Sequence, residues 1–203
     1  KLSHADARAV DGDAVSVLSD AARFAAVVPD DVTLIVDATA SLQVLAAASK
    51  AAPLAGCSAR LVRAAMYGQG RCAVLMLEGP GRTVRVDDLA ALLFEHCRVN
   101  PEVRVAIAGD STEPTRVFVG DNCRSLTTPI SDAVVSRSAA PMAIQIERWL
   151  VGGLPLSGQL CIGVADAAAL GMSWTTVATS PVTVVSVTED GGWDVRVLPA
   201  VAE

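Results

Sequence analysis

The chain has 203 residues, of which 52% are hydrophobic, 19% are charged and only 3% are aromatic. This composition excludes a largely disordered chain, which would be polar and highly charged, and it predicts a core built from Val, Leu, Ile and Ala. The net charge of −6 argues against nucleic-acid binding, which selects for basic surfaces, and no apolar run reaches the roughly 18–20 residues that span a membrane.

The five cysteines, at positions 57, 72, 97, 123 and 161, are an odd number without paired spacing. We therefore expect no disulfide framework and a reducing, cytoplasmic environment. The sequence has no Cys-x-x-Cys pair, so no zinc site is predicted. Because it begins with Lys1 and ends among strand-like residues, we expect it to be a piece of a longer protein.

The first strongly patterned stretch covers residues 32–41 and reads VTLIVDATAS. Its apolar, β-branched start predicts a strand buried on both faces, as in a parallel sheet covered by helices. Ser41 then opens a predicted helix over Leu42–Ala52, which completes a βα pair. Ahead of this pair, a Ser-Asp dipeptide ending at Asp20 is expected to cap a short helix that reaches Val28.

Two apolar runs follow, Ala59–Met66 and Cys72–Leu77. The short glycine-containing connection between them predicts an antiparallel strand pair. Asp87 is then expected to cap the clearest amphipathic helix of the chain. Its apolar residues recur at i, i+3, i+4 and i+8 from Leu89, which places them on one helical face.

The remaining sequence mixes strand-like and helical patterns. Strand-like runs are predicted at residues 103–108, 117–119, 160–165, 175–178 and 182–187 and in the WDVRV segment at 193–197. A long helix is predicted from about Ser131 to Leu150, and Pro141 inside it is expected to kink or break it.

Together these elements predict an α/β fold. We expect a Rossmann-like three-layer sandwich with a mixed sheet, in which parallel βα units come first and antiparallel strands lie towards the C-terminus. Residues 1–188 are predicted to form this domain. Residues 189–203 are predicted to be a linker or the start of a following domain.

Asp37 ends the first predicted strand. In open α/β sheets ligands bind beyond the carboxyl ends of the strands, so an acid at this position can hold a metal-bound phosphate or a ribose. The alternative is an acidic turn residue that accepts hydrogen bonds from backbone donors near Ser41. The residues alone leave both interpretations open.

Cys123 lies in the polar segment Gly-Asp-Asn-Cys-Arg-Ser, whereas the other cysteines lie in or beside apolar runs. A neighbouring cation such as Arg124 favours the nucleophilic thiolate, while Asp121 opposes this effect. A reactive thiol and an ordinary loop cysteine both fit this pattern.

The glycine-rich and nucleophilic motifs of common enzyme classes are missing from the sequence. There is no Walker-type loop and no Gly-x-Ser-x-Gly elbow. The segment Gly68-Gln69-Gly70 lacks the third glycine and the following helix of a dinucleotide fingerprint. The two histidines, His4 and His96, are far apart in the sequence.

The motif Asp37-Ala38-Thr39, which ends a strand and precedes a capped helix, resembles the second half of ThiF/MoeB/HesA-type proteins. These proteins are relatives of ubiquitin-activating enzymes. In that family the aspartate helps to hold ATP and its Mg²⁺. The resemblance therefore implies that Asp37 binds ATP and Mg²⁺ and that Thr39 belongs to the same cofactor site.

The segment NCRSLTTPISDAVVSRSAA is similar to the crossover loop of the family, which bears the catalytic cysteine in many members. The resemblance implies that Cys123 is this thiol, with Asn122, Arg124 and Thr127 as its neighbours. A further likeness concerns residues 192–197, which resemble the entry into a JAB/MPN-type metalloprotease that is fused to some bacterial ThiF-like domains.

The resemblance implies an ATP-dependent activating enzyme. It would adenylate the C-terminus of a ubiquitin-like or sulfur-carrier protein, pass the acyl group to Cys123 as a thioester, and work as a homodimer. The glycine-rich, nucleotide-binding half of the family is missing from this sequence, so the fragment alone is expected to be inactive.

Two other hypotheses fit the same sequence. The first is a non-catalytic ThiF-like module for dimerisation or partner docking, in which Asp37 and Cys123 are structural. The second is the later half of a nicotinamide-dependent oxidoreductase, which the βα pair permits but no fingerprint supports.

Overall fold

The computed structural model describes residues 9–109, 130–166, 171–179, 184–187 and 193–196 of the chain. Its centre is a five-stranded sheet with the order β1-β2-β3-β4-β5, in which β1 and β2 are parallel and the other neighbours are antiparallel. The predicted α/β fold with a mixed sheet is therefore confirmed. The strands are β1 (Leu34–Asp37), β2 (Arg60–Tyr67), β3 (Cys72–Leu77), β4 (Gln159–Ala165) and β5 (Met172–Ala178).

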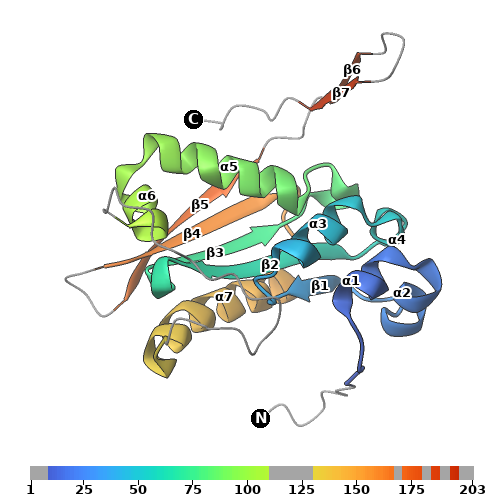
Figure 1. Cartoon of the computed structure of the whole chain (residues 1–203), viewed down its shortest axis with the longest axis horizontal. Helices are drawn as coiled ribbons and strands as arrows, with labels where there is room; N and C mark the ends of the chain where they lie inside the picture. The colour runs from blue at the N-terminus through green and yellow to red at the C-terminus, as the bar shows by residue number, and fades with distance from the viewer. Residues whose placement is uncertain (1–8, 110–129, 167–170, 180–183, 188–192, 197–203) are drawn as a thin grey trace.

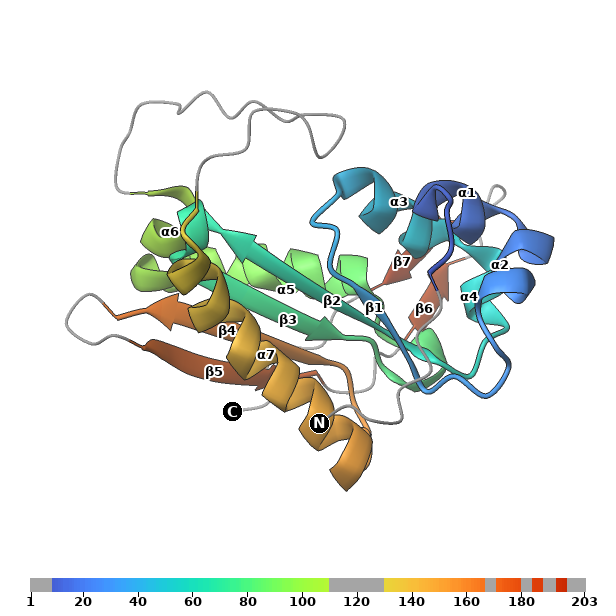
Figure 2. The same ribbon diagram turned by 90° about the horizontal axis from the view of Figure 1, so that it is seen from below.

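Helices cover both faces of the sheet, which gives three layers (Figure 1). One face packs against a core that draws on α1 to α6, and the opposite face packs against α7, which lies across the strands in Figure 2. The helices are α1 (Ala14–Ser19), α2 (Ala21–Val27), α3 (Leu42–Lys50), α4 (Ala52–Ala55), α5 (Val86–Val99), α6 (Pro101–Ala108) and α7 (Asp132–Gly152), with 3₁₀ turns η1 (Gly68–Gly70) and η2 (Pro80–Arg82).

The strand that is buried on both faces is β3, not β1. All six residues of β3 are buried, because α5 and α6 lie on one side of it and α7 on the other. β1 lies at the edge of the sheet, and the side chain of Val36 is 47% exposed. The expectation of a doubly buried first strand was wrong, since an unbroken apolar run reports hydrophobicity but not the place of a strand in the sheet.

The predicted strand at residues 103–108 is also wrong, because this segment forms α6. Asn100 caps the helix: its side-chain oxygen accepts hydrogen bonds from the backbone N–H groups of Glu102 and Val103, at 3.0 and 3.2 Å. Pro101 occupies the first helical position, which suits its fixed φ. The alternating β-branched residues suggested a strand, but the cap and the proline favour a helix.

Two further helix expectations need correction. α5 begins after Arg85, and the side chain of Asp88 accepts a hydrogen bond from the Arg85 backbone N–H at 2.9 Å, so Asp87 is not the cap. Pro141 does not break α7, which runs on to Gly152, although a proline inside an isolated helix costs about 3 kcal/mol. Met142 and Trp149 are buried against the sheet, and this packing offsets the cost.

The segment Gly68-Gln69-Gly70 forms η1, the tight connection between β2 and β3. Both glycines have positive φ, and a Cβ atom at Gly68 would lie 1.9 Å from the Ala106 carbonyl oxygen. At Gly70 a Cβ atom would lie 2.3 Å from a Val134 methyl group. These glycines are therefore required because α6 and α7 approach the turn closely.

The C-terminal strands form a separate two-stranded sheet, in which β6 (Val184–Val187) pairs with β7 (Trp193–Arg196) in antiparallel register. The predicted domain boundary after residue 188 falls between these two strands. Among the described residues, every helix is too short or too polar to traverse a bilayer.

Candidate functional site

Asp37 lies at the carboxyl end of β1, where the sequence places it. It stands directly opposite Arg63 in the parallel pairing of β1 with β2, so both side chains project from the same face of the sheet. Arg63 donates a hydrogen bond from Nη1 to Asp37 Oδ2. The side chains of Asp37 and Arg63 are only 7% and 3% exposed, so the two groups form a buried ion pair.

The second carboxylate oxygen of Asp37 organises the turn that follows β1. Oδ1 accepts hydrogen bonds from the Thr39 backbone N–H at 2.9 Å and from the Thr39 hydroxyl at 2.6 Å. The Thr39 hydroxyl oxygen accepts a hydrogen bond from the Ser41 backbone N–H at 3.2 Å. Ser41 then caps α3 by accepting a hydrogen bond from the Val44 N–H at 3.3 Å. The structure thus brings Asp37 and Thr39 together, and both support the start of α3.

This arrangement bears on whether the residues fit ATP and Mg²⁺. A metal-bound phosphate would have to reach a buried carboxylate whose two oxygens already accept hydrogen bonds from Arg63 and Thr39. Among the described residues, no group of three or more His, Cys, Asp or Glu side chains lies close enough to hold a metal ion. The residues around Asp37, as they are placed, do not fit the cofactor, and its role in binding ATP stays a prediction.

The other predicted site residue, Cys123, lies outside the described residues, as do its neighbours Asn122, Arg124 and Thr127. The structure therefore does not place the candidate thiol relative to Asp37. The four described cysteines, Cys57, Cys72, Cys97 and Cys161, are free thiols.

Sequence reasoning missed a second buried acid, Glu78, which follows β3 and is 1% exposed. Its side chain accepts hydrogen bonds from Arg82 Nη2 at 3.1 Å and from the Val86 backbone N–H at 3.2 Å. Arg82 also donates a hydrogen bond to the Ala48 carbonyl at 2.8 Å, so Glu78 helps to join β3 to the start of α5 and the end of α3. Burial raises the pKa of Glu78, and the nearby Arg82 opposes that rise.

Arg60 strengthens the same end of the sheet. Its guanidinium donates to the Glu78 carbonyl from Nε at 2.6 Å, and to the carbonyls of Pro155 and Ser157 at 2.6 and 2.9 Å. These contacts tie β2 to the loop between α7 and β4. The sequence feature that could have indicated these buried arginine contacts is the pair of arginines, at 60 and 63, within an otherwise apolar strand.

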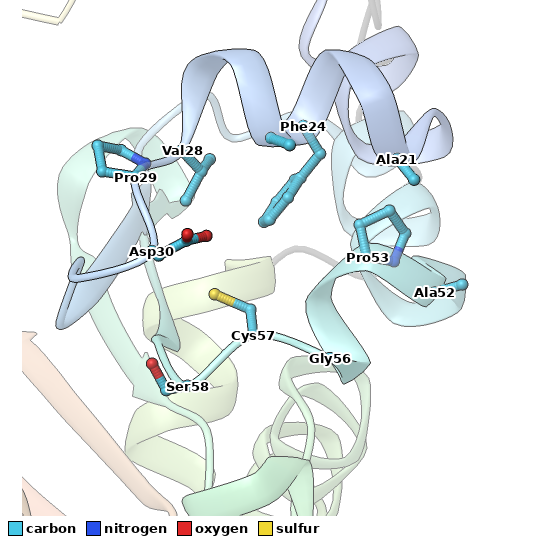
Figure 3. Close-up of a pocket in the computed structure, with 11 residues that line it drawn as sticks. Ala21, Phe24, Val28, Pro29, Asp30, Ala52, Pro53, Gly56, Cys57 and Ser58 are labelled. Atoms are coloured by element: carbon cyan, nitrogen blue, oxygen red, sulfur yellow. The ribbon is translucent and has the colours of Figure 1, made fainter.

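A concavity with a volume of about 470 Å³ lies between α2 and α4 (Figure 3). Most of the residues that line it are of apolar type, among them Phe24, Val28 and Pro53. The Asp30 carboxylate and the Cys57 thiol point towards one another inside it, in the same space as the Phe24 ring (Figure 3). We call this concavity the α2–α4 pocket. No motif in the sequence indicated it.

No protein-family model, curated protein or solved structure matches the chain.

Proposed function

We propose that this chain is a non-catalytic α/β module that acts by docking to protein partners. The observation that carries the proposal is the closed environment of Asp37, the acid on which the enzymatic hypothesis depends. Arg63 and Thr39 bind both of its oxygens from within the chain. A residue engaged in this way stabilises the β1–α3 turn.

Electrostatics support the same conclusion. A divalent cation placed at Asp37 would stand beside the buried guanidinium of Arg63, and two positive charges a few ångströms apart repel strongly in a low dielectric. Moving Arg63 away would leave its guanidinium without the carboxylate that compensates its burial. Breaking a buried ion pair costs about 3–5 kcal/mol.

The alternative is the activating enzyme, in which ATP and Mg²⁺ bind at Asp37 and Cys123 forms a thioester with a ubiquitin-like or sulfur-carrier protein. The observation that favours it is the position of Asp37 at the carboxyl end of β1, just before the N-terminus of α3. This alternative requires a nucleotide-binding half supplied from outside these residues.

Binding of Mg-ATP to the full-length protein tests the proposal. We expect no saturable heat signal in isothermal titration calorimetry and no ATP–pyrophosphate exchange above background. Saturable, Mg²⁺-dependent binding that is lost in Asp37→Asn while circular dichroism shows a folded protein would overturn the proposal. Faster alkylation of Cys123 than of a free cysteine, measured at graded pH, would also contradict the proposal and favour the activating enzyme.

The docking hypothesis includes self-association, and we propose a homodimer joined along β5. β5 is an edge strand of seven uncharged residues, and no described strand pairs with its outer edge. Long unprotected edges of this kind favour pairing with a second strand. Light scattering should give twice the monomer mass for the wild type and the monomer mass for Thr175→Lys, with the exposed helix variant Gln43→Lys as control. A monomeric wild type would contradict the dimer.

The four described cysteines are free thiols, which supports a reducing cytoplasm as the location of the module.

A further inference from the structure

We propose that the α2–α4 pocket binds an apolar side chain of a partner protein whose neighbouring residues are basic. This inference deepens the docking function proposed above and rests on it. It assigns both the surface that binds and the chemistry of the bound segment.

The shape of the pocket follows from small residues on both of the helices that flank it. Ala21 and Ala25 of α2 line one side, and Ala52 and Gly56 in and after the one-turn helix α4 line the other. Protein interiors are normally filled to the density of organic crystals, so a gap left by facing alanines and glycine lacks the contacts that a larger side chain would make. An apolar group from outside can supply them.

Core packing and two prolines hold part of the pocket lining in place. Phe24 is 7% exposed and belongs to the core, so its ring is held in place by packing. Pro29 and Pro53 restrict the backbone at the end of α2 and the start of α4. A preformed apolar concavity binds a side chain with little loss of conformational freedom, which is how interface anchor residues bind.

The charge around the pocket identifies the kind of partner. Asp30 is the one charged residue among those that line the pocket, and Asp20, Asp31 and the basic Arg23 adjoin lining residues in the sequence. Arg23 Nε lies 3.8 Å from Asp20 Oδ2, so the Asp20 carboxylate partly compensates the positive charge of Arg23. The Asp30 carboxylate projects into the pocket itself (Figure 3). Such a surface attracts Lys and Arg side chains and repels acidic segments, so charge complementarity selects a basic partner.

The two features act together on one ligand. The apolar walls hold a Leu or aromatic side chain, and the Asp30 carboxylate at the same site accepts hydrogen bonds from an adjacent guanidinium or ammonium group. A neutral apolar ligand would contact only the apolar lining, and a basic segment without an apolar side chain would interact only with the Asp30 carboxylate, so each should bind more weakly than a ligand with both features.

Fluorescence anisotropy with a defined probe tests this assignment. The probe is the fluorescein-labelled peptide Gly-Arg-Arg-Leu-Leu-Arg-Arg-Gly, and the protein is the full chain. We expect saturable binding that weakens as salt is added, because the charges are exposed. A peptide with both leucines replaced by alanine should bind at least about tenfold more weakly, and one with the arginines replaced by glutamate should not bind measurably.

Two matched pairs of variants locate the site. Ala25→Trp fills the pocket from an exposed position and should weaken binding about tenfold, whereas Ala26→Trp, exposed on the same helix outside the pocket, should change it less than about twofold. Asp30→Asn should weaken binding about threefold at low salt, and Glu147→Gln, which removes one charge from α7, should not.

The outcomes separate the two proposals. Equal binding by Ala25→Trp and Ala26→Trp, with both variants folded by circular dichroism, overturns the pocket as the site. Equal binding of the leucine and alanine peptides overturns the apolar anchor, and tight binding of the glutamate peptide overturns the basic partner. Absence of saturable binding by the probe overturns the pocket as a site for a basic segment with an apolar anchor and leaves the docking function standing, whereas saturable binding of Mg-ATP, measured separately, removes the docking function.

Discussion

Asp37 and Asp30 lie within a few residues of each other in the sequence, yet their surroundings differ completely. Asp37 is buried, paired with Arg63 and hydrogen-bonded to Thr39. Asp30 is exposed and projects into an apolar pocket (Figure 3). The acid that belongs to a recognisable motif is enclosed by the chain, and the acid that belongs to no motif faces a space open to a ligand.

The position of Asp37 at a strand end does not by itself determine its role, because the residue opposite it on the neighbouring strand also matters. Arg63 lies in register with Asp37 and pairs with it, whereas the residues around Asp30 in the pocket are mostly small or apolar.

The largest effect is expected at the enclosed pair. Arg63→Ala should lower the free energy of unfolding by about 3–5 kcal/mol, because it leaves the Asp37 carboxylate buried without its partner. The double variant Asp37→Asn/Arg63→Met should recover most of this loss, since both charges are removed while the amide oxygen can still accept the hydrogen bonds from Thr39. Urea denaturation of the single and double variants measures both values. A loss below about 0.5 kcal/mol in Arg63→Ala would show that the pair is not a structural unit.

The thiols provide a second contrast between the pocket and the interior. Cys57 faces the pocket, whereas Cys72 is fully buried and its burial raises the pKa of its thiol to about 12. Iodoacetamide should therefore modify Cys57 at least about a hundredfold faster than Cys72, which reacts only when the chain opens. Mass spectrometry of digested samples gives a rate for each cysteine. Denatured protein, in which the two rates should converge, is the control.

Glu78 is a second enclosed acid and should also be required for stability. Glu78→Ala should lower the free energy of unfolding by about 1–3 kcal/mol, because it leaves donors on Arg82 and Val86 without their acceptor. Chemical denaturation measures the change, and the exposed acid variant Glu147→Ala serves as the control. Equal stability of the two variants would contradict the role assigned to Glu78.

The same residue predicts the sign of a pH dependence. Burial raises the pKa of Glu78 above 4.5, so the folded chain holds this proton more tightly than the unfolded chain. Relative to Glu78→Gln, which cannot ionise, the wild type should be most stable below pH 4.5 and should lose stability as the pH rises through the raised pKa. Denaturation from acidic to neutral pH checks this. If the wild type instead gained stability relative to Glu78→Gln as the pH rises, the attraction of Arg82 for the Glu78 carboxylate would outweigh the effect of burial on its pKa.

The smallest effect on stability is expected at the open carboxylate. Asp30→Asn should change the free energy of unfolding by less than about 0.5 kcal/mol, because its carboxylate is exposed. Thermal and urea denaturation of this variant should match the wild type. A large destabilisation would show that Asp30, like Asp37 and Glu78, is required for stability, and the proposed difference between Asp30 and Asp37 would be wrong.

Local chemistry was sufficient to predict much of the fold. The strand pair β2–β3 was predicted because two apolar runs flank a glycine-containing turn. The caps at Asp20 and Ser41 were predicted because each oxygen-bearing residue precedes a helical pattern, and their side chains accept the expected backbone hydrogen bonds. The prediction failed where two local patterns favoured different structures. At α6 the alternating β-branched residues favoured a strand, although Asn100 and Pro101 favour the start of a helix.

The fold class, the order of most elements and the place of Asp37 at a strand end could all be predicted from the sequence, since they depend on residues close together in the chain. Folding was needed to show that Arg63 lies opposite Asp37, that Glu78 is buried against Arg82, and that small residues leave a pocket beside Asp30. The physical reason is that burial and charge compensation depend on neighbours brought together by folding, and strand register is set by packing across the whole sheet.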